Sequence, residues 1–162
     1  ERVPNKLGRT VIVDYAHNAA SLENLLSTLR EHTSGRIVCL FGCGGDRAKS
    51  RRFEMGEISG KMADLTIITS DNPRTEPPED ILSNIETGVL KTSGKYIKII
   101  DRTQAIKYAI ENAVENDIIV IAGKGHETYQ IFADRTIHYD DVEVAKSLIE
   151  EIRNQNVKSD NK

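Results

Sequence analysis

The 162-residue chain has no tryptophan, only two cysteines and no long apolar run. Its longest apolar runs, such as 118–122, are about five residues long, far below the roughly 20 needed to cross a bilayer. Two cysteines form no disulfide framework, and no basic stretch leads into an apolar segment at the start, so we expect a cytoplasmic protein without membrane contact. The 22 Lys plus Arg are fewer than the 25 Asp plus Glu, and the net charge of -3 argues against nucleic acid as a partner.

The length is that of one domain with one substantial core. We predict a single domain over residues 1–154. Residues 155–162 form a polar tail that we expect to be disordered.

Short β-branched runs alternate with helical patterns along this domain. The runs are apolar on both faces, which predicts strands covered on both sides: 10–13, 37–41, 65–69, 96–100 and 118–121. Amphipathic helices are predicted at 21–30, 81–90 and 141–153, and Asp101 with Gln104 and Asp140 with Glu143 have the spacing of capping boxes. The alternation predicts an α/β fold, a three-layer open and mostly parallel sheet, in which a hairpin of 128–132 and 136–139 adds an antiparallel edge.

Four of the five strand ends carry unusual polar strings. They are DYAHN at 14–18, GCGGDR at 42–47, SDNPR at 70–74 and AGKGHE at 122–127. Because the carboxyl ends of parallel strands meet at one rim of a sheet, we expect these strings to lie together. Each alone has a structural alternative: Asn18 as a helix cap, the glycines of 42–45 as a tight turn, and Asn72-Pro73 as a turn dipeptide.

Several kinds of active site are excluded by spacing. Neither GCGGDR nor AGKGHE matches a Walker phosphate loop or a dinucleotide fingerprint. Cys39 and Cys43 have no second pair of ligands at zinc spacing, and no serine lies in a nucleophile elbow. We therefore assign no catalytic residue and no metal ligand.

The rim strings combine charges of both signs. Arg47 and Arg74 are suited to clamp a carboxylate, while Glu127 and Asp71 are suited to accept an ammonium group. This set complements an amino acid. Internal ion pairs between arginine and glutamate at the loop mouths are the alternative.

The four strings in this order resemble the C-terminal domain of the Mur ligases over nearly the whole chain, from residue 1 to about 151. The resemblance implies a Rossmann-like domain that works with two others of the same enzyme. An N-terminal domain holds the UDP-sugar, and a central domain holds most of the ATP and magnesium site. The C-terminal domain is a lid that brings the amino acid. The chain alone is then expected to be inactive, and the enzyme to be a monomer.

The string DNPR resembles the members that add meso-diaminopimelate to UDP-N-acetylmuramoyl-L-alanyl-D-glutamate in peptidoglycan biosynthesis. In that reaction ATP phosphorylates the D-glutamate γ-carboxylate, and the amine then attacks the acyl phosphate. The residues expected to bind the amino acid are Arg47, Asp71, Asn72, Pro73, Arg74, Gly123 and Glu127, and those expected to face the nucleotide are Asp14 and His17. A lysine-adding or other ligase of the superfamily, and a non-catalytic α/β ligand-binding module, remain alternatives.

Overall fold

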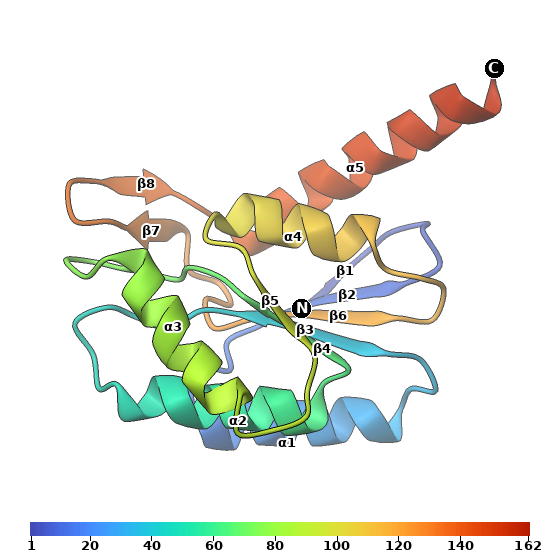
Figure 1. Ribbon diagram of the computed structural model, residues 1–162. Coiled ribbons are helices and arrows are strands. Elements are labelled where there is room, and N and C mark those ends of the chain that lie inside the picture. Colours follow the sequence, from blue (N-terminus) through green and yellow to red (C-terminus); the bar gives the residue numbers. More distant parts are fainter.

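A six-stranded sheet forms the centre of the computed structural model, which describes residues 1–162 (Figure 1). Its order is β1-β2-β6-β3-β4-β5, and all neighbours are parallel except β1, which is antiparallel to β2. The strands are β1 (Arg2–Val3), β2 (Thr10–Asp14), β3 (Ile37–Phe41), β4 (Leu65–Ile68), β5 (Tyr96–Lys98) and β6 (Ile118–Ala122).

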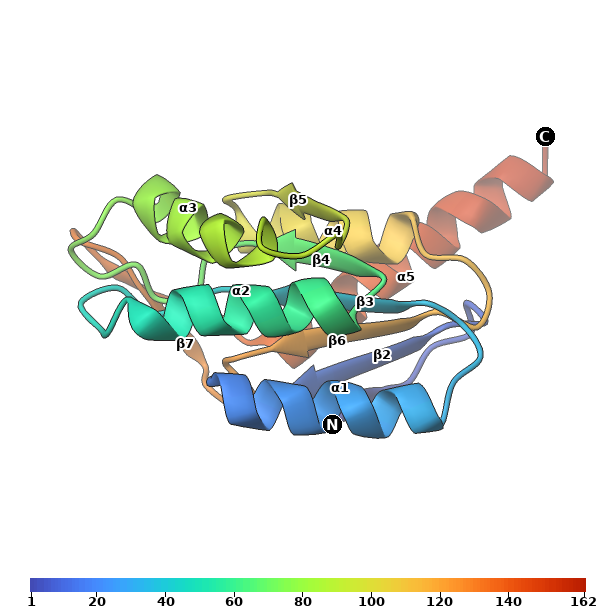
Figure 2. The ribbon, with the colours of Figure 1, turned by 60° about the horizontal axis from the view of Figure 1, so that its bottom comes forward.

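Five helices cover the two faces of the sheet. One face packs against α1 (Ala19–Glu31), α2 (Ser50–Met62) and α3 (Pro78–Val89), and the other against α4 (Arg102–Glu111) and α5 (Asp141–Asp160) (Figure 2). None of the five is both long and apolar enough to span a membrane. The three layers confirm the predicted α/β architecture.

The core is divided into two clusters by the alternation of side chains along each strand. Val38 and Leu40 of β3 face α4 and α5, whereas Ile37, Cys39 and Phe41 face α1, α2 and α3. All five residues of β3 and all five of β6 are buried, because both strands lie inside the sheet with helices on both sides.

Helix α2 and strand β1 were not predicted. Two glycines and few apolar residues weaken the amphipathic pattern of α2, but one of them, Gly56, together with Gly88 of α3, lets the two helices lie close together. A Cβ on Gly56 would lie 2.2 Å from the carbonyl oxygen of Ile85, and one on Gly88 would lie 2.1 Å from that of Phe53. Backbone contact, not an apolar stripe, joins these two helices.

Three expectations need correction. Strands β7 (Tyr129–Ile131) and β8 (Thr136–His138) form the predicted hairpin, but as a separate sheet, and β1 provides the antiparallel edge of the main one. Helix α5 continues through the expected tail to Asp160, since no Gly or Pro interrupts its last turns, although every residue after Ile152 is exposed. Asp101 and Asp140 cap their helices, but the reciprocal box forms at Asn18 and Ser21.

The chain segments that leave β6 and its two neighbours, β2 and β3, run to opposite faces of the sheet. After β2 and β3 the chain turns to α1 and α2 on one face, while after β6 it passes through the hairpin to α5 on the other. Such a divergence opens a crevice at the carboxyl ends of the strands. The candidate site lies there.

Candidate functional site

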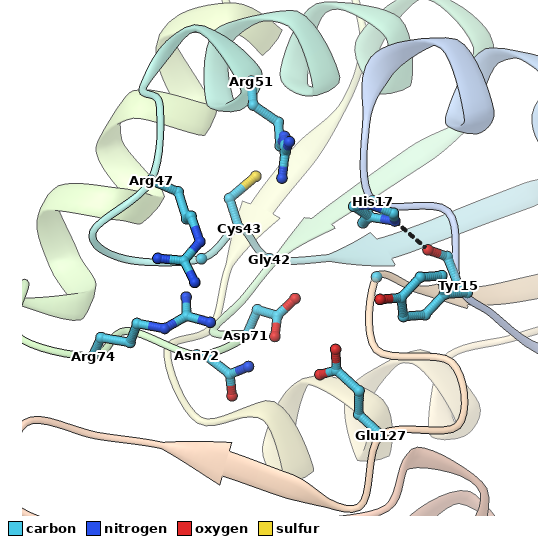
Figure 3. Close-up of a pocket in the computed structure, with 12 residues that line it drawn as sticks. Tyr15, His17, Gly42, Cys43, Arg47, Arg51, Asp71, Asn72, Arg74 and Glu127 are labelled. Carbon is cyan, nitrogen blue, oxygen red and sulfur yellow. Dashed lines mark hydrogen bonds between the residues drawn. The ribbon is translucent and has the colours of Figure 1, made fainter.

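A pocket of about 170 Å³ opens at the carboxyl ends of β2, β3, β4 and β6 (Figure 3). It brings together Arg51 of α2 and residues from all four rim strings, namely Tyr15, His17, Gly42, Cys43, Gly44, Arg47, Asp71, Asn72, Arg74, Gly123 and Glu127. The predicted convergence on one rim is therefore confirmed. Of the predicted site residues, Asp14 and Pro73 do not line the pocket.

The loop after β3 is held against the loop after β4 by a buried guanidinium. Arg52 forms an ion pair with Glu76 and donates hydrogen bonds to Asn84 Oδ1 (2.9 Å) and to the Gly44 carbonyl (3.1 Å). Glu76 in turn accepts a hydrogen bond from the Asp46 amide at 2.8 Å. Arg52 thus fixes the backbone that carries Arg47.

Backbone contact joins the same two loops at Gly45 and Pro73. The Gly45 amide donates to the Asn72 carbonyl at 2.8 Å, and a Cβ on Gly45 would lie 1.7 Å from the Pro73 oxygen. Only glycine fits there. Pro73 therefore shapes the loop rather than the pocket surface.

Arg47 and Arg74 project into the pocket from the two neighbouring loops after β3 and β4 (Figure 3). Each donates one hydrogen bond to a carbonyl oxygen, Arg47 to Asp46 and Arg74 to Gly45, both at 3.0 Å. Neither guanidinium forms an ion pair, unlike Arg52 beside them. The alternative of internal arginine–glutamate pairs is thus not realised by these two residues, and this end of the pocket is electrostatically suited to an anion.

Arg74 also has a backbone φ of 54°, in the left-handed region that a residue with a Cβ rarely adopts. Its amide donates to the Ile131 carbonyl of β7 at 3.0 Å. The hairpin therefore supports the strained turn that directs Arg74 toward the pocket.

Asp71 and Glu127 line the other side of the pocket, and both contact Lys124. The Lys124 ammonium is completely buried, 3.5 Å from Asp71 Oδ1 and 3.4 Å from Glu127 Oε2. It also donates to Asn72 Oδ1 at 3.2 Å. Lys124 is not among the residues that the sequence predicts for the site. The signal that could have identified it is a lysine between two glycines, directly after a fully buried strand.

The two glycines beside Lys124 have left-handed backbone, with φ of 109° at Gly123 and 55° at Gly125. A Cβ on Gly123 would lie 3.2 Å from Asp71 Oδ2, and one on Gly125 would lie 2.8 Å from Tyr15 Cβ. These turns direct the lysine inward and leave the strand end open to the pocket.

A third buried cation, after Arg52 and Lys124, lies beneath the rim. Arg102, at the start of α4, donates to both carboxylate oxygens of Asp141 (2.8 and 2.7 Å), to the Ser70 carbonyl (3.0 Å) and to the Ala122 carbonyl (3.3 Å). Burial alone lowers the pKa of Arg102, but the Asp141 carboxylate outweighs it and keeps that pKa above its ordinary value. The SDNPR and AGKGHE strings are thus anchored to one guanidinium.

Aromatic rings form the third side of the pocket. The ring centroid of Tyr15 is 4.8 Å from that of His17 and 5.5 Å from that of His126. Asp14 accepts a hydrogen bond from the Ala16 amide at 2.8 Å and shapes the turn beneath these rings. Of the two residues expected to face a nucleotide, only His17 reaches the pocket.

Neither cysteine is suited to nucleophilic chemistry. Cys39 and Cys43 are buried, and burial raises the pKa of each thiol to about 12. The side chains gather no group of three His, Cys, Asp or Glu around a point that a metal ion would occupy. What the pocket presents is binding chemistry: unpaired guanidinium groups on one side and carboxylates on the other.

Comparison with known proteins identifies a family. Residues 1–125 match the family model described as "Mur ligase, glutamate ligase domain". Two ligases described as UDP-N-acetylmuramoyl-L-alanyl-D-glutamate--2,6-diaminopimelate ligases are similar: one from Clostridium acetobutylicum is 53% identical over 92% of this chain, and one from Caldanaerobacter subterraneus is 48% identical over 91%.

Solved structures are similar as well. A ligase described by the same name superposes on 94% of this chain with a TM-score of 0.89 and 39% identity. A UDP-N-acetylmuramate-alanine ligase from Thermotoga maritima, 17% identical with a TM-score of 0.65 over 96% of the chain, shares the fold. The chain spans 31% of the length of the two curated relatives.

Proposed function

Because this chain belongs to the Mur ligase family, as its glutamate ligase domain, we propose that it is the amino-acid-binding domain of an ATP-dependent ligase. The proposed substrate is meso-diaminopimelate, joined to UDP-N-acetylmuramoyl-L-alanyl-D-glutamate in peptidoglycan biosynthesis. Two relatives that are about half identical to this chain are named for this reaction.

The observation that carries the substrate assignment is the pairing of charges in the pocket. Arg47 and Arg74 have no carboxylate partner, and Figure 3 shows them on one side of the pocket, with Asp71 between them and Glu127. Diaminopimelate carries an ammonium and a carboxylate at each end, so its distal end satisfies both sides. The distal end of lysine carries an ammonium alone and would leave the guanidinium groups unpaired, at a cost in binding.

In the proposed role, this domain contributes orientation. Arg47, Arg74, Asn72, Asp71 and Glu127 grip one end of a flexible diamino acid, with Gly123 allowing close approach, so that the other amine is presented to the acceptor. ATP, bound mainly by the rest of the enzyme together with magnesium, supplies the activation of the acceptor carboxylate. His17 lies at the pocket edge where a nucleotide would approach, and Asp14 supports it through the turn.

The test is amide formation by the full-length enzyme with meso-diaminopimelate and with lysine, for wild type and Arg74→Ala. We expect wild type to prefer diaminopimelate. Arg74→Ala should lower kcat/KM for diaminopimelate by about 30-fold or more, the effect of truncating one partner of a desolvated charge pair, without raising KM for ATP. Arg153→Ala removes an exposed arginine from α5 and serves as the control.

Equal use of lysine by wild type would favour a lysine-adding relative. Amide formation that is unaffected by Arg74→Ala would contradict the assignment of the pocket. We expect the isolated chain neither to hydrolyse ATP nor to form amides, because its sequence contains no phosphate-binding loop. Turnover by the pure chain would contradict that expectation.

A further inference from the structure

Lys124 lies behind the wall of the pocket and contacts three of its residues. Its side chain is completely buried, and its ammonium group lies 5.6 Å from the ring centroid of Tyr129. Its polar partners are Asp71, Asn72 and Glu127, all of which line the pocket. An ammonium in this position is costly to desolvate, so its partners are held close to it.

The first consequence concerns the orientation of Asn72. Its Oδ1 accepts hydrogen bonds from Lys124 Nζ at 3.2 Å and from the Ile131 amide at 3.0 Å. Both partners are donors, so the amide oxygen must face them and the NH2 group must face away. Figure 3 shows the Asn72 nitrogen turned toward Glu127 and the oxygen turned away from it. Lys124 thereby makes Asn72 present its donor NH2 group, and not its oxygen, on the side that faces Glu127 and the pocket.

The second consequence concerns charge. Lys124 is the only ion-pair partner of Asp71 and of Glu127. Two carboxylates with one ammonium leave a single net negative charge on this side of the pocket. That charge matches one ligand ammonium, with the guanidinium groups of Arg47 and Arg74 left for one carboxylate.

We propose that Lys124 is a positioning and specificity-determining residue of the amino-acid pocket. It orients the Asn72 amide and sets the charge presented by Asp71 and Glu127, so that a zwitterionic group is preferred over a lone ammonium. This inference rests on the proposed function, because it concerns the same pocket.

The test uses the full-length enzyme with Lys124→Met, which keeps the length of the side chain and removes its charge. We expect KM for meso-diaminopimelate to rise by about 30-fold or more while KM for ATP is unchanged. The preference for diaminopimelate over lysine should also fall, since lysine lacks the distal carboxylate and its net charge is one unit more positive, while the altered pocket has lost one positive charge. Lys61→Met makes the same change at an exposed lysine of α2 and should alter neither.

Unchanged amino-acid KM and unchanged preference in Lys124→Met would overturn the proposal. If that variant fails to fold, Asn72→Asp decides: it keeps the shape and gives Lys124 another carboxylate, but it replaces the donor with an acceptor. We expect a folded enzyme with a raised amino-acid KM, and a wild-type KM would overturn the proposal. If wild type prefers another amino acid, the proposed substrate fails, and the effect of Lys124 is measured with the preferred one.

Discussion

Replacing Asp141 with asparagine is expected to destabilise the domain strongly, because it leaves Arg102 charged and buried without its counterion. Both side chains are completely buried, with Arg102 Nη2 2.7 Å from Asp141 Oδ2 and Nε 2.8 Å from Oδ1. Asparagine has nearly the same shape, but its NH2 group would face a guanidinium that can only donate. The substitution therefore removes charge and one hydrogen bond without opening a cavity.

The expected loss is about 3 to 5 kcal/mol in the free energy of unfolding, the range for breaking a buried ion pair from one side. For a chain of this size that corresponds to a fall in Tm of about 6 to 20 °C. The same change at Asp134 provides a matched control. Asp134 and Arg135 also lie 3.0 Å apart, but their side chains are 75% and 58% exposed, so the expected cost is about 0 to 1 kcal/mol.

Urea unfolding followed by far-ultraviolet circular dichroism measures both variants, since the chain has no tryptophan to report by fluorescence. A double variant, Arg102→Met with Asp141→Asn, should recover part of the loss because no unpaired charge stays buried. Equal losses for Asp141→Asn and Asp134→Asn, or a double variant in which the two losses simply add, would refute the reasoning. We also expect Asp141→Asn to weaken amino-acid binding, because Arg102 holds the Ser70 and Ala122 carbonyls beneath the pocket.

Three further outcomes are expected. Gly88→Ala should destabilise the domain by up to about 2 kcal/mol, because forcing α2 and α3 apart costs about 1 to 3 kcal/mol and alanine gains roughly 1 kcal/mol in a helix. Ser83→Ala on the exposed side of α3 is the control, and equal urea midpoints for the two variants would contradict the contact. Arg74→Gly should be about 1 kcal/mol more stable than Arg74→Ala, since only alanine has a Cβ to strain at a φ of 54°, and equal stability would argue against that strain. Glu143 Oε2 lies 2.8 Å from His138 Nε2 and raises the pKa of His138 above 6.5. The pair therefore stabilises the fold below pH 6.5, and its contribution is lost as the pH rises through the raised pKa. An NMR titration should show a lower His138 pKa in Glu143→Gln, and an unchanged pKa would contradict the pairing.

Much of the fold follows from local pattern. The runs that form β3 and β6 are apolar on both faces and fully buried, as only a covered parallel sheet accommodates, and the β-branched runs of β2, β4 and β5 mark their neighbours. Helix α2 was missed because it is held by backbone contact at Gly56 and Gly88, which leaves no apolar stripe in the sequence. The short β1 was missed because two residues carry no periodicity, and its pairing with β2 is a long-range choice.

For the site, the order of strands and polar strings was enough to predict that Arg47, Arg74, Asp71 and Glu127 meet at one rim, because the carboxyl ends of parallel strands share an edge. The sequence pattern could not predict which charged side chains pair with one another. Which cation neutralises which carboxylate depends on burial and distance between residues far apart in the chain. Lys124, and not an arginine, pairs with Asp71 and Glu127, while Arg52 takes Glu76 and Arg102 takes Asp141. Tertiary structure alone decided that Arg47 and Arg74 form no ion pair, because a buried ion must be matched within the fold and an accessible one need not be.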